Sequence, residues 1–167
     1  MLSSKHLKYL KSLSKKKYRL ENQQFIVEGY RAVQELLKSK NKVEKLYTTD
    51  EFLIKHSGIK KDLNQFNFDI ISEIDFNKIV NTKSPQHIMA LVYMKPVSNL
   101  SEIKGNVLLL DDISDPGNMG TLLRTSAWYG IKNIFCSINS VDIYNPKVVR
   151  SAMGAHFYID NLNHIDI

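Results

Sequence analysis

Two segments in the second half of the chain combine polar side chains that can do chemistry with glycines that let a ligand approach the backbone. In the first segment, the apolar run 107–110 is followed by two consecutive aspartates and an Asp-Pro-Gly turn. We predict that a helix then begins at Asn118 and carries Arg124 in its second turn. Ligands bind beyond the carboxyl ends of strands in open α/β sheets, so we expect a site at this strand–turn–helix.

Asn118 and Arg124 are the residues of this segment best suited to act together. Six helical positions separate them, which places them about 120° apart in projection, so both can face one cleft. A simpler alternative stays open, in which Asn118 only caps the helix and Arg124 only forms a surface salt bridge.

The second segment places Lys147, Arg150 and Ser151 in a predicted helix over 146–153 that has proline in its first turn. Backbone N–H groups and the helix dipole favour anions at such a position, so we expect Lys147 and Arg150 to contact RNA phosphates. The alternative is a helix that packs its valines into the core and leaves its charges in water.

Basic residues are concentrated in the first part of the chain. Residues 1–100 hold 18 Lys and Arg against 10 Asp and Glu, whereas residues 101–167 hold 5 against 7. A cationic surface releases counterions when it binds a polyanion, which predicts RNA binding. The predicted contact residues in the first twenty positions are Lys5, Lys8, Lys15, Lys16, Lys17 and Arg19. Lysine outnumbers arginine 19 to 4, so a merely solvated face remains the alternative.

Strand and helix patterns alternate through the first 95 residues, which favours an α/β layer sandwich. The opening stretch 3–19 is predicted to be one amphipathic helix, with Leu7, Leu10 and Leu13 on one face. We expect strands at 25–27, 43–49, 68–72 and 88–94, and further helices at 30–40, 51–56 and 73–80.

The stretch 96–105 lacks periodicity and is predicted to be a linker, which gives domains at 1–95 and 106–167. In the second domain we expect strands at 107–110, 134–137 and 156–159, and helices at 118–129 and 146–153. Three strands and two helices leave a parallel sheet with an open edge. Either another chain covers that edge or the domain continues past Ile167.

Composition excludes several classes of protein. At 43% hydrophobic and 24% charged residues, the chain is typical of a soluble globular protein. No apolar run approaches the length of a membrane span, and no secretory signal is seen. Cys136 is the only cysteine, which excludes an internal disulfide and fits a cytoplasmic protein. The five histidines show no i, i+3 or i, i+4 pairing with one another, so no metal site is expected.

The two chemical segments also carry a family resemblance. DPGNMGTLLRTSAWYG and YNPKVVRSAMGAHF resemble motifs 1 and 2 of the SpoU (TrmH-like) branch of the SPOUT RNA methyltransferases. FIVEGYRAVQELL and SPQHIMALV resemble the substrate-binding domain of that family, which is L30e-like. The resemblance covers nearly the whole chain. It implies an N-terminal L30e-like α/β sandwich and an incomplete C-terminal SPOUT domain of the knotted class.

The resemblance implies transfer of a methyl group from S-adenosylmethionine to a ribose 2′-OH of RNA, with 23S rRNA more expected than tRNA. By carry-over, Arg124 brings the hydroxyl toward its deprotonated form and Asn118 positions the reacting groups. The family also implies a homodimer when full length.

This chain departs from the family pattern in three places. The usual R-A-S-x-G-A of motif 2 has Ser151 and Ala152 exchanged, and His87 stands where glycine is common. Motif 3 does not occur, so we expect most cofactor-binding residues to lie beyond Ile167 and assign none. The alternative function is therefore a non-catalytic RNA-binding fragment or remnant of such an enzyme.

Overall fold

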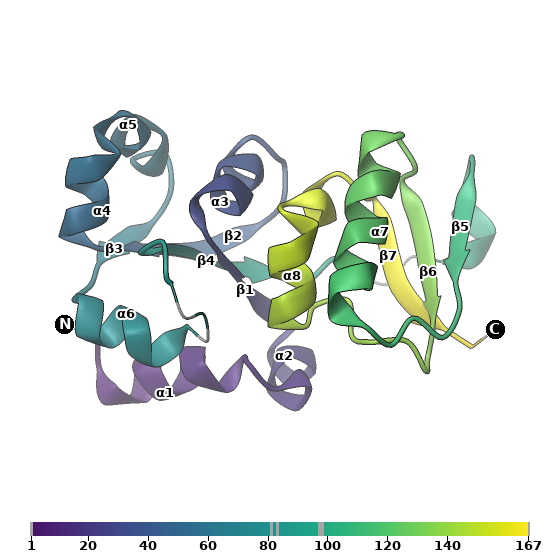
Figure 1. Ribbon diagram of the computed structural model, residues 1–167, viewed down its shortest axis with the longest axis horizontal. Coiled ribbons are helices and arrows are strands. Elements are labelled where there is room, and N and C mark those ends of the chain that lie inside the picture. Colours follow the sequence, from purple (N-terminus) through teal and green to yellow (C-terminus); the bar gives the residue numbers. More distant parts are fainter. Residues whose placement is uncertain (1, 81, 83, 97–98, 167) are drawn as a thin grey trace. The chain divides into compact units, whose positions relative to one another are not determined.

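The computed structural model describes residues 2–80, 82, 84–96 and 99–166, and it divides into two compact units, Met1–Tyr93 and Met94–Ile167 (Figure 1). The predicted linker 96–105 includes residues 97 and 98, which lie outside the described residues. The later part of that stretch contains a short 3-10 helix, η2 (Leu100–Glu102). No helix in the described ranges is both long enough and apolar enough to cross a membrane.

In its described residues, the first unit contains one mixed sheet with the strand order β1-β4-β2-β3. Its strands are β1 (Gln24–Glu28), β2 (Val43–Thr48), β3 (Phe68–Ile70) and β4 (Ile88–Tyr93). β4 lies inside the sheet and runs antiparallel to both β1 and β2, whereas β3 is parallel to β2. The first five residues of β4 are buried, which explains why this strand is apolar at consecutive positions.

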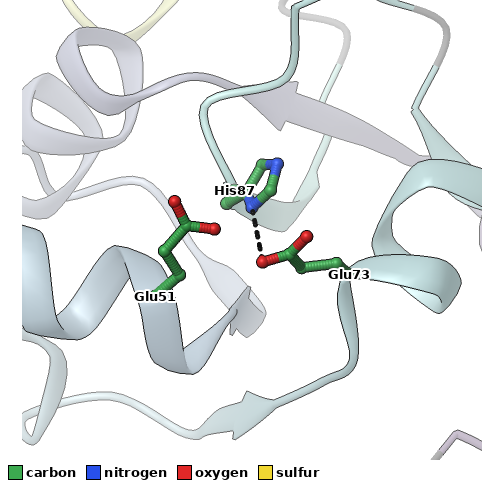
Figure 2. Close-up of side chains that lie close together, drawn as sticks. All are labelled: Glu51, Glu73 and His87. Carbon is green, nitrogen blue, oxygen red and sulfur yellow. Dashed lines mark ion pairs between the residues drawn. The ribbon is translucent and has the colours of Figure 1, made fainter.

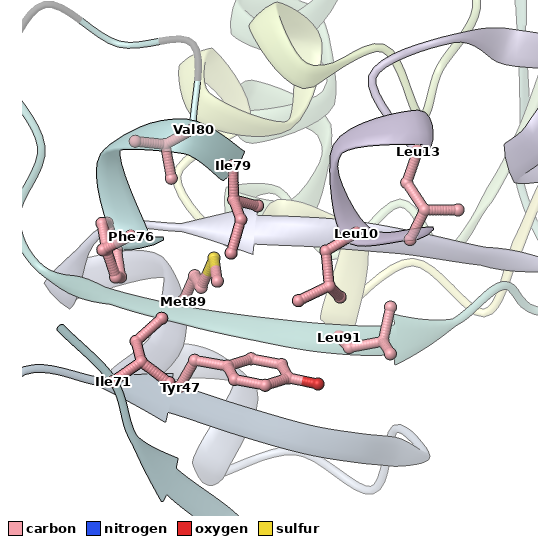
Figure 3. Close-up of a cluster of buried hydrophobic side chains, with 9 residues drawn as sticks. All are labelled: Leu10, Leu13, Tyr47, Ile71, Phe76, Ile79, Val80, Met89 and Leu91. Atoms are coloured by element: carbon pink, nitrogen blue, oxygen red, sulfur yellow. The ribbon is translucent and has the colours of Figure 1, made fainter. Parts of the chain in front are cut away.

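Helices cover both faces of this sheet, with α1 and α6 on one side and α3 and α4 on the other (Figure 1). The helices are α1 (Ser4–Ser12), α2 (Lys16–Asn22), α3 (Tyr30–Leu37), α4 (Asp50–Lys55), α5 (Lys60–Leu63) and α6 (Glu73–Ile79), with a 3-10 turn, η1 (Ser57–Ile59). Leu10 and Leu13 are almost fully buried and pack into a cluster with Phe76 and Ile79 on the sheet (Figure 3).

The prediction of a single helix over 3–19 is wrong, because the chain turns between α1 and α2. Arg19 explains the turn: its side chain is buried, and its Nη1 donates to the carbonyl oxygens of Leu13 and Ser14 at 2.8 and 2.9 Å. These carbonyls follow the end of α1, where no helical N–H is left to pair with them. The guanidinium therefore holds the corner between the two helices.

The described part of the second unit contains a parallel sheet in the order β5-β6-β7. Its elements are β5 (Val107–Leu110), α7 (Pro116–Trp128), β6 (Asn133–Ser137), α8 (Pro146–Ala152), η3 (Ala155–Phe157) and β7 (Asn161–Ile165). Every residue of β6 is buried between its two neighbours. On β5, at the edge, the side chains of Val107 and Leu109 are about half exposed.

The third strand of this unit does not lie at 156–159, as the apolar pattern predicts. That stretch forms the turn η3 and its exit, beginning after Gly154 at a φ of 93°. Phe157 and Ile159 are still buried there, so their apolar character reflects packing in a turn. β7 begins at Asn161, whose side chain donates to Asn133 Oδ1 of β6 at 2.7 Å.

Candidate active site on α7 and α8

The start of α7 sets the position of Asn118. Asp115 is the N-cap, and its carboxylate accepts a hydrogen bond from the backbone N–H of Asn118 at 2.7 Å. Pro116 is the first helical residue, so α7 begins two positions before the predicted start. The alternative that Asn118 is itself the cap is therefore wrong. Its side chain is exposed in the first turn, where it is available to a ligand.

Arg124 projects from the third turn of α7 and is exposed. Its Nη1 donates to Met153 Sδ at 3.1 Å, and Met153 ends α8 in a left-handed conformation at a φ of 50°. Among the described residues, no ion pair involves Arg124, so the salt-bridge alternative finds no support. A thioether is a weak acceptor, which leaves the guanidinium positive charge largely uncompensated.

Helix α8 approaches α7 closely at Gly120. A β-carbon on residue 120 would lie 1.8 Å from Ser151 Oγ and 2.8 Å from the backbone nitrogen of Ala152. Ser151 Oγ lies within hydrogen-bond distance of the carbonyl oxygen of Pro116 at 3.1 Å and of the carbonyl oxygen of Lys147, in its own helix, at 2.9 Å. Lys147 and Arg150, which come from the same helix, are exposed and half-buried respectively. The two motif helices are thus one packed pair that carries all four predicted polar residues.

The loop after β5 is tied to the end of β6 by two buried serines. The backbone N–H of Asp112 donates to Ser137 Oγ at 2.9 Å, and that of Ile113 donates to Ser140 Oγ at 3.1 Å. Asp112 itself has a φ of 48°, a conformation that aspartate tolerates better than most residues. These bonds fix the carboxyl edge of the sheet from which α7 departs.

The predicted RNA-binding residues of the first unit divide into two groups. The side chains of Lys5, Lys8, Lys15, Lys16 and Lys17 are exposed along α1, α2 and the turn between them. Arg19 is 2% exposed, and its guanidinium donates hydrogen bonds to the backbone carbonyls of Leu13 and Ser14. The prediction that Arg19 contacts RNA is therefore wrong. Sequence alone could not distinguish it, because it belongs to the same basic run.

Two family models match this chain, one in each unit. The MRM3-like substrate binding domain matches residues 4–90, and the SpoU rRNA methylase family matches residues 105–166. The chain belongs to the SpoU family. The unit that holds Asn118 and Arg124 is the one that matches the methylase.

Relatives of this SpoU chain are RNA methyltransferases by name. It is 35% identical over 149 residues to the 23S rRNA (guanosine(2553)-2′-O)-methyltransferase RlmP of Bacillus subtilis, covering 89% of this chain and 58% of that protein. It is 30% identical over 163 residues to the mitochondrial rRNA methyltransferase 3 of Xenopus tropicalis, covering 90% of this chain and 38% of that protein. The chain thus spans less than two thirds of the length of these relatives.

Solved structures share the fold. A protein of Porphyromonas gingivalis assigned to the TrmH family of RNA methyltransferases superposes with a TM-score of 0.82 at 34% identity, covering 99% of this chain and 63% of that one. The SpoU methyltransferase AviRb of Streptomyces viridochromogenes superposes with a TM-score of 0.80 at 19% identity, covering 99% and 64%. The predicted α/β fold class is confirmed, and the parallel sheet of the second unit is consistent with the predicted SPOUT domain.

The first unit of this SpoU chain also brings together side chains that the sequence does not place side by side. Figure 2 shows Glu51 of α4, Glu73 of α6 and His87 before β4 pointing toward one another. His87 Nδ1 lies 4.0 Å from Glu73 Oε1 and 3.4 Å from Thr49 Oγ1. The three residues are far apart in the sequence, so a search for histidine spacing could not find this cluster.

Buried titratable groups in the second unit have structural roles. Burial raises the pKa of the Cys136 thiol to about 11, which makes it a poor nucleophile. Burial also lowers the pKa of His156 to about 4, although its Nε2 lies 2.7 Å from the carbonyl oxygen of Ile143. Both groups are therefore neutral at pH 7 and belong to the packed interior.

Proposed function

We propose that this SpoU chain is part of an enzyme that transfers a methyl group from S-adenosylmethionine to a ribose 2′-OH of RNA, with 23S rRNA as the substrate class. One observation carries the proposal: the unit that matches the SpoU rRNA methylase family is the unit in which helix α7 presents both Asn118 and Arg124 to solvent. The 35% identity to RlmP, a 23S rRNA 2′-O-methyltransferase by name, supports the choice of substrate class.

Arg124 stabilises the attacking oxygen in this proposal. An alcohol must lose its proton as it becomes a nucleophile, and a fixed guanidinium nearby favours the developing negative charge. Arginine keeps its own proton at any physiological pH, so it acts through its charge and its N–H donors. Asn118, six residues earlier on α7, orients the ribose hydroxyls through its amide. The hydroxyl proton leaves to solvent.

S-adenosylmethionine supplies an electrophilic methyl group on a sulfonium when it is bound. Val107 and Leu109 on β5 and Ile138 after β6 are 48%, 54% and 61% exposed, so apolar surface that could pack on an adenine lies open to solvent. For that reason no residue of this chain is assigned to the cofactor, and no step is derived through it.

RNA is the partner in this proposal, and the exposed lysines of α1 and α2 contact its phosphates. Lys147 and Arg150 lie on α8, the helix that packs against α7, and hold the phosphates that flank the target ribose. We also propose that the complete enzyme is a cytoplasmic homodimer. Light scattering on the complete enzyme tests the dimer.

The direct test is methyl transfer to ribosomal RNA. The complete enzyme is incubated with unmodified 23S rRNA and isotopically labelled S-adenosylmethionine. The RNA is then digested to nucleosides, which are separated and identified by mass spectrometry. We expect a labelled 2′-O-methyl nucleoside. Label on a base, or no label in the presence of bound RNA and cofactor, would refute the proposal.

The open apolar surface of the second unit favours one alternative, in which the 167-residue chain alone is a non-catalytic RNA-binding unit. Calorimetric titration of S-adenosylmethionine into this chain separates the two possibilities. Saturable binding at micromolar concentration supports a working donor site. RNA binding without any heat from the cofactor supports the alternative.

A further inference from the structure

The first unit contains a pocket of about 360 Å³ that the methyl-transfer proposal does not use. Three separate segments build it: the β1–α3 junction at Tyr30, helix α4 with His56 after it, and the stretch 85–87 that leads into β4. Its volume lies within the range of small-ligand sites, at the lower end.

Backbone geometry draws two of these segments tightly together. Gln86 Oε1 accepts a hydrogen bond from the Tyr30 backbone N–H at 2.7 Å. Gly29 has a φ of 99°, and a β-carbon there would lie 3.0 Å from the same Gln86 oxygen. Because of the positive φ and the close contact, residue 29 must be glycine, and the wall that includes Tyr30 is held in place before any ligand arrives.

Aromatic rings form one side of the pocket. The ring centroids of Tyr30 and His56 are 4.6 Å apart at an interplanar angle of 35°. Phe52 supports both rings from a buried position, 4.6 Å from His56 and 5.6 Å from Tyr30. Tyr30 and His56 are only half-buried, so they line the cavity while Phe52 holds them in place. Rings at such a wall suit a planar ligand that stacks.

Polar groups line the rest of the pocket. Glu51, Lys55 and His87 all border it. Gln86 uses its side-chain oxygen to accept the bond from the Tyr30 N–H, and its side-chain NH₂ group can donate to a ligand. The Glu73 carboxyl shares a hydrogen bond with Glu51, which raises the pKa of Glu73. Lys55 adds a positive charge suited to a phosphate.

We propose that this pocket takes one unpaired base of the RNA substrate, which stacks on Tyr30 and His56 and presents its edge to Glu51, Gln86 and His87. The inference rests on the proposed function, because it specifies how the substrate-binding unit reads RNA. Single-stranded bases that are splayed out and stacked on aromatic side chains are the usual targets of specific RNA recognition. A duplex cannot enter the pocket, so the first unit selects RNA with a bulged or looped nucleotide.

The experiment measures binding of the 167-residue chain to a fluorescein-labelled RNA hairpin with one bulged adenosine, and to the same hairpin with an abasic bulge. Stacking of one base contributes about 1–3 kcal/mol, so we expect the abasic RNA to bind roughly tenfold more weakly. Tyr30→Ala and His56→Ala should weaken binding to the adenosine hairpin by a similar factor and leave binding to the abasic hairpin unchanged.

Tyr129→Ala is the matched control, because Tyr129 is an exposed tyrosine of the second unit and does not line the pocket. Tyr30→Phe keeps the ring and should retain base-dependent binding. With 2-aminopurine as the bulged base, fluorescence should be quenched on binding to the unaltered chain, which tests stacking without any variant.

The outcomes separate the two proposals. Equal affinity for the adenosine and abasic hairpins, with no quenching, would overturn the base pocket while RNA binding stands. Equal weakening of both hairpins by Tyr30→Ala would likewise overturn it. No binding to any RNA would overturn the proposed RNA-binding function and the pocket with it.

Discussion

Ser151 Oγ occupies the space that a side chain on Gly120 would need, 1.8 Å from the ideal position of that β-carbon. The same oxygen lies within hydrogen-bond distance, 3.1 Å, of the carbonyl oxygen of Pro116, the first residue of α7. One serine therefore sets both the spacing of α7 and α8 and the attachment of α8 to the turn that positions Asn118. The exchange of Ser and Ala in motif 2 places this hydroxyl at the helix contact.

Gly120→Ala should destabilise the chain. The new methyl group would meet Ser151 Oγ and Cβ and the Ala152 backbone nitrogen at 2.8 Å or less, so the helices must separate. Overpacking of this kind costs about 1–3 kcal/mol. Urea unfolding measures the loss. Gly58→Ala is the control, because a β-carbon at residue 58 meets nothing within 4 Å. Equal stability of the two variants would contradict close packing of α8 against α7 at residue 120.

Replacement of Arg19 should reduce stability without altering the salt dependence of RNA binding. Arg19→Gln removes the hydrogen bonds to the carbonyls of Leu13 and Ser14 and leaves buried acceptors unpaired, which costs about 1–3 kcal/mol. Thermal unfolding and RNA titrations at several salt concentrations test the two halves of the prediction. A shallower salt dependence with unchanged stability would restore Arg19 as an RNA contact.

The exposed lysines should behave in the opposite way. Replacing Lys15, Lys16 and Lys17 with alanine removes three exposed charges from the α1–α2 turn and the start of α2. We expect the slope of log affinity for an rRNA hairpin against log salt to become shallower by roughly 0.7–0.9 for each phosphate that the protein no longer neutralises. The control replaces Lys38, Lys40 and Lys42, which are also exposed. An equal effect of both triple variants would indicate a diffuse charge effect.

His156 should make the chain less stable in mild acid. Burial lowers its folded pKa to about 4, whereas the unfolded side chain titrates near 6.5. The unfolded state therefore binds the proton first, so stability is complete above pH 6.5 and falls as pH drops toward 4. We expect a loss of about 2 kcal/mol between about pH 7.5 and pH 5 from this residue.

Urea unfolding at the two pH values measures that loss, and His156→Gln is the comparison that removes the titrating group. The variant should lose about 2 kcal/mol less than the unaltered chain over the same interval. Identical pH dependence of the two proteins would show that His156 is not held neutral by burial.

Elements with a clear apolar period can be predicted from sequence. Residues 107–110 form β5 as expected, and Leu10 and Leu13 lie in the core. β7 does not show such a period, because its sequence, Asn-Leu-Asn-His-Ile, is largely polar. It is a strand because it pairs with β6, where Asn161 bonds to Asn133. Pairing with a neighbouring strand, and not local composition, makes this segment a strand.

Site residues are predictable only where the motif is local. Asn118 and Arg124 lie on one helix, so their relation follows from spacing, although the cap is Asp115 and not Asn118. The pocket around Tyr30 and His56 depends on three distant segments brought together by the sheet, and no local spacing reveals it. The burial of Arg19 is equally hidden, because it depends on where α1 ends.

The most direct test of the account is methyl transfer by Arg124→Ala in the complete enzyme, measured beside RNA affinity. Arg31→Ala serves as the matched control, because Arg31 is an exposed arginine on α3 of the other unit. We predict that Arg124→Ala lowers the rate of transfer to the ribose 2′-OH by about 100-fold or more while RNA affinity changes little. A rate within a few-fold of the unaltered enzyme would contradict the role of Arg124 and the proposed site on α7.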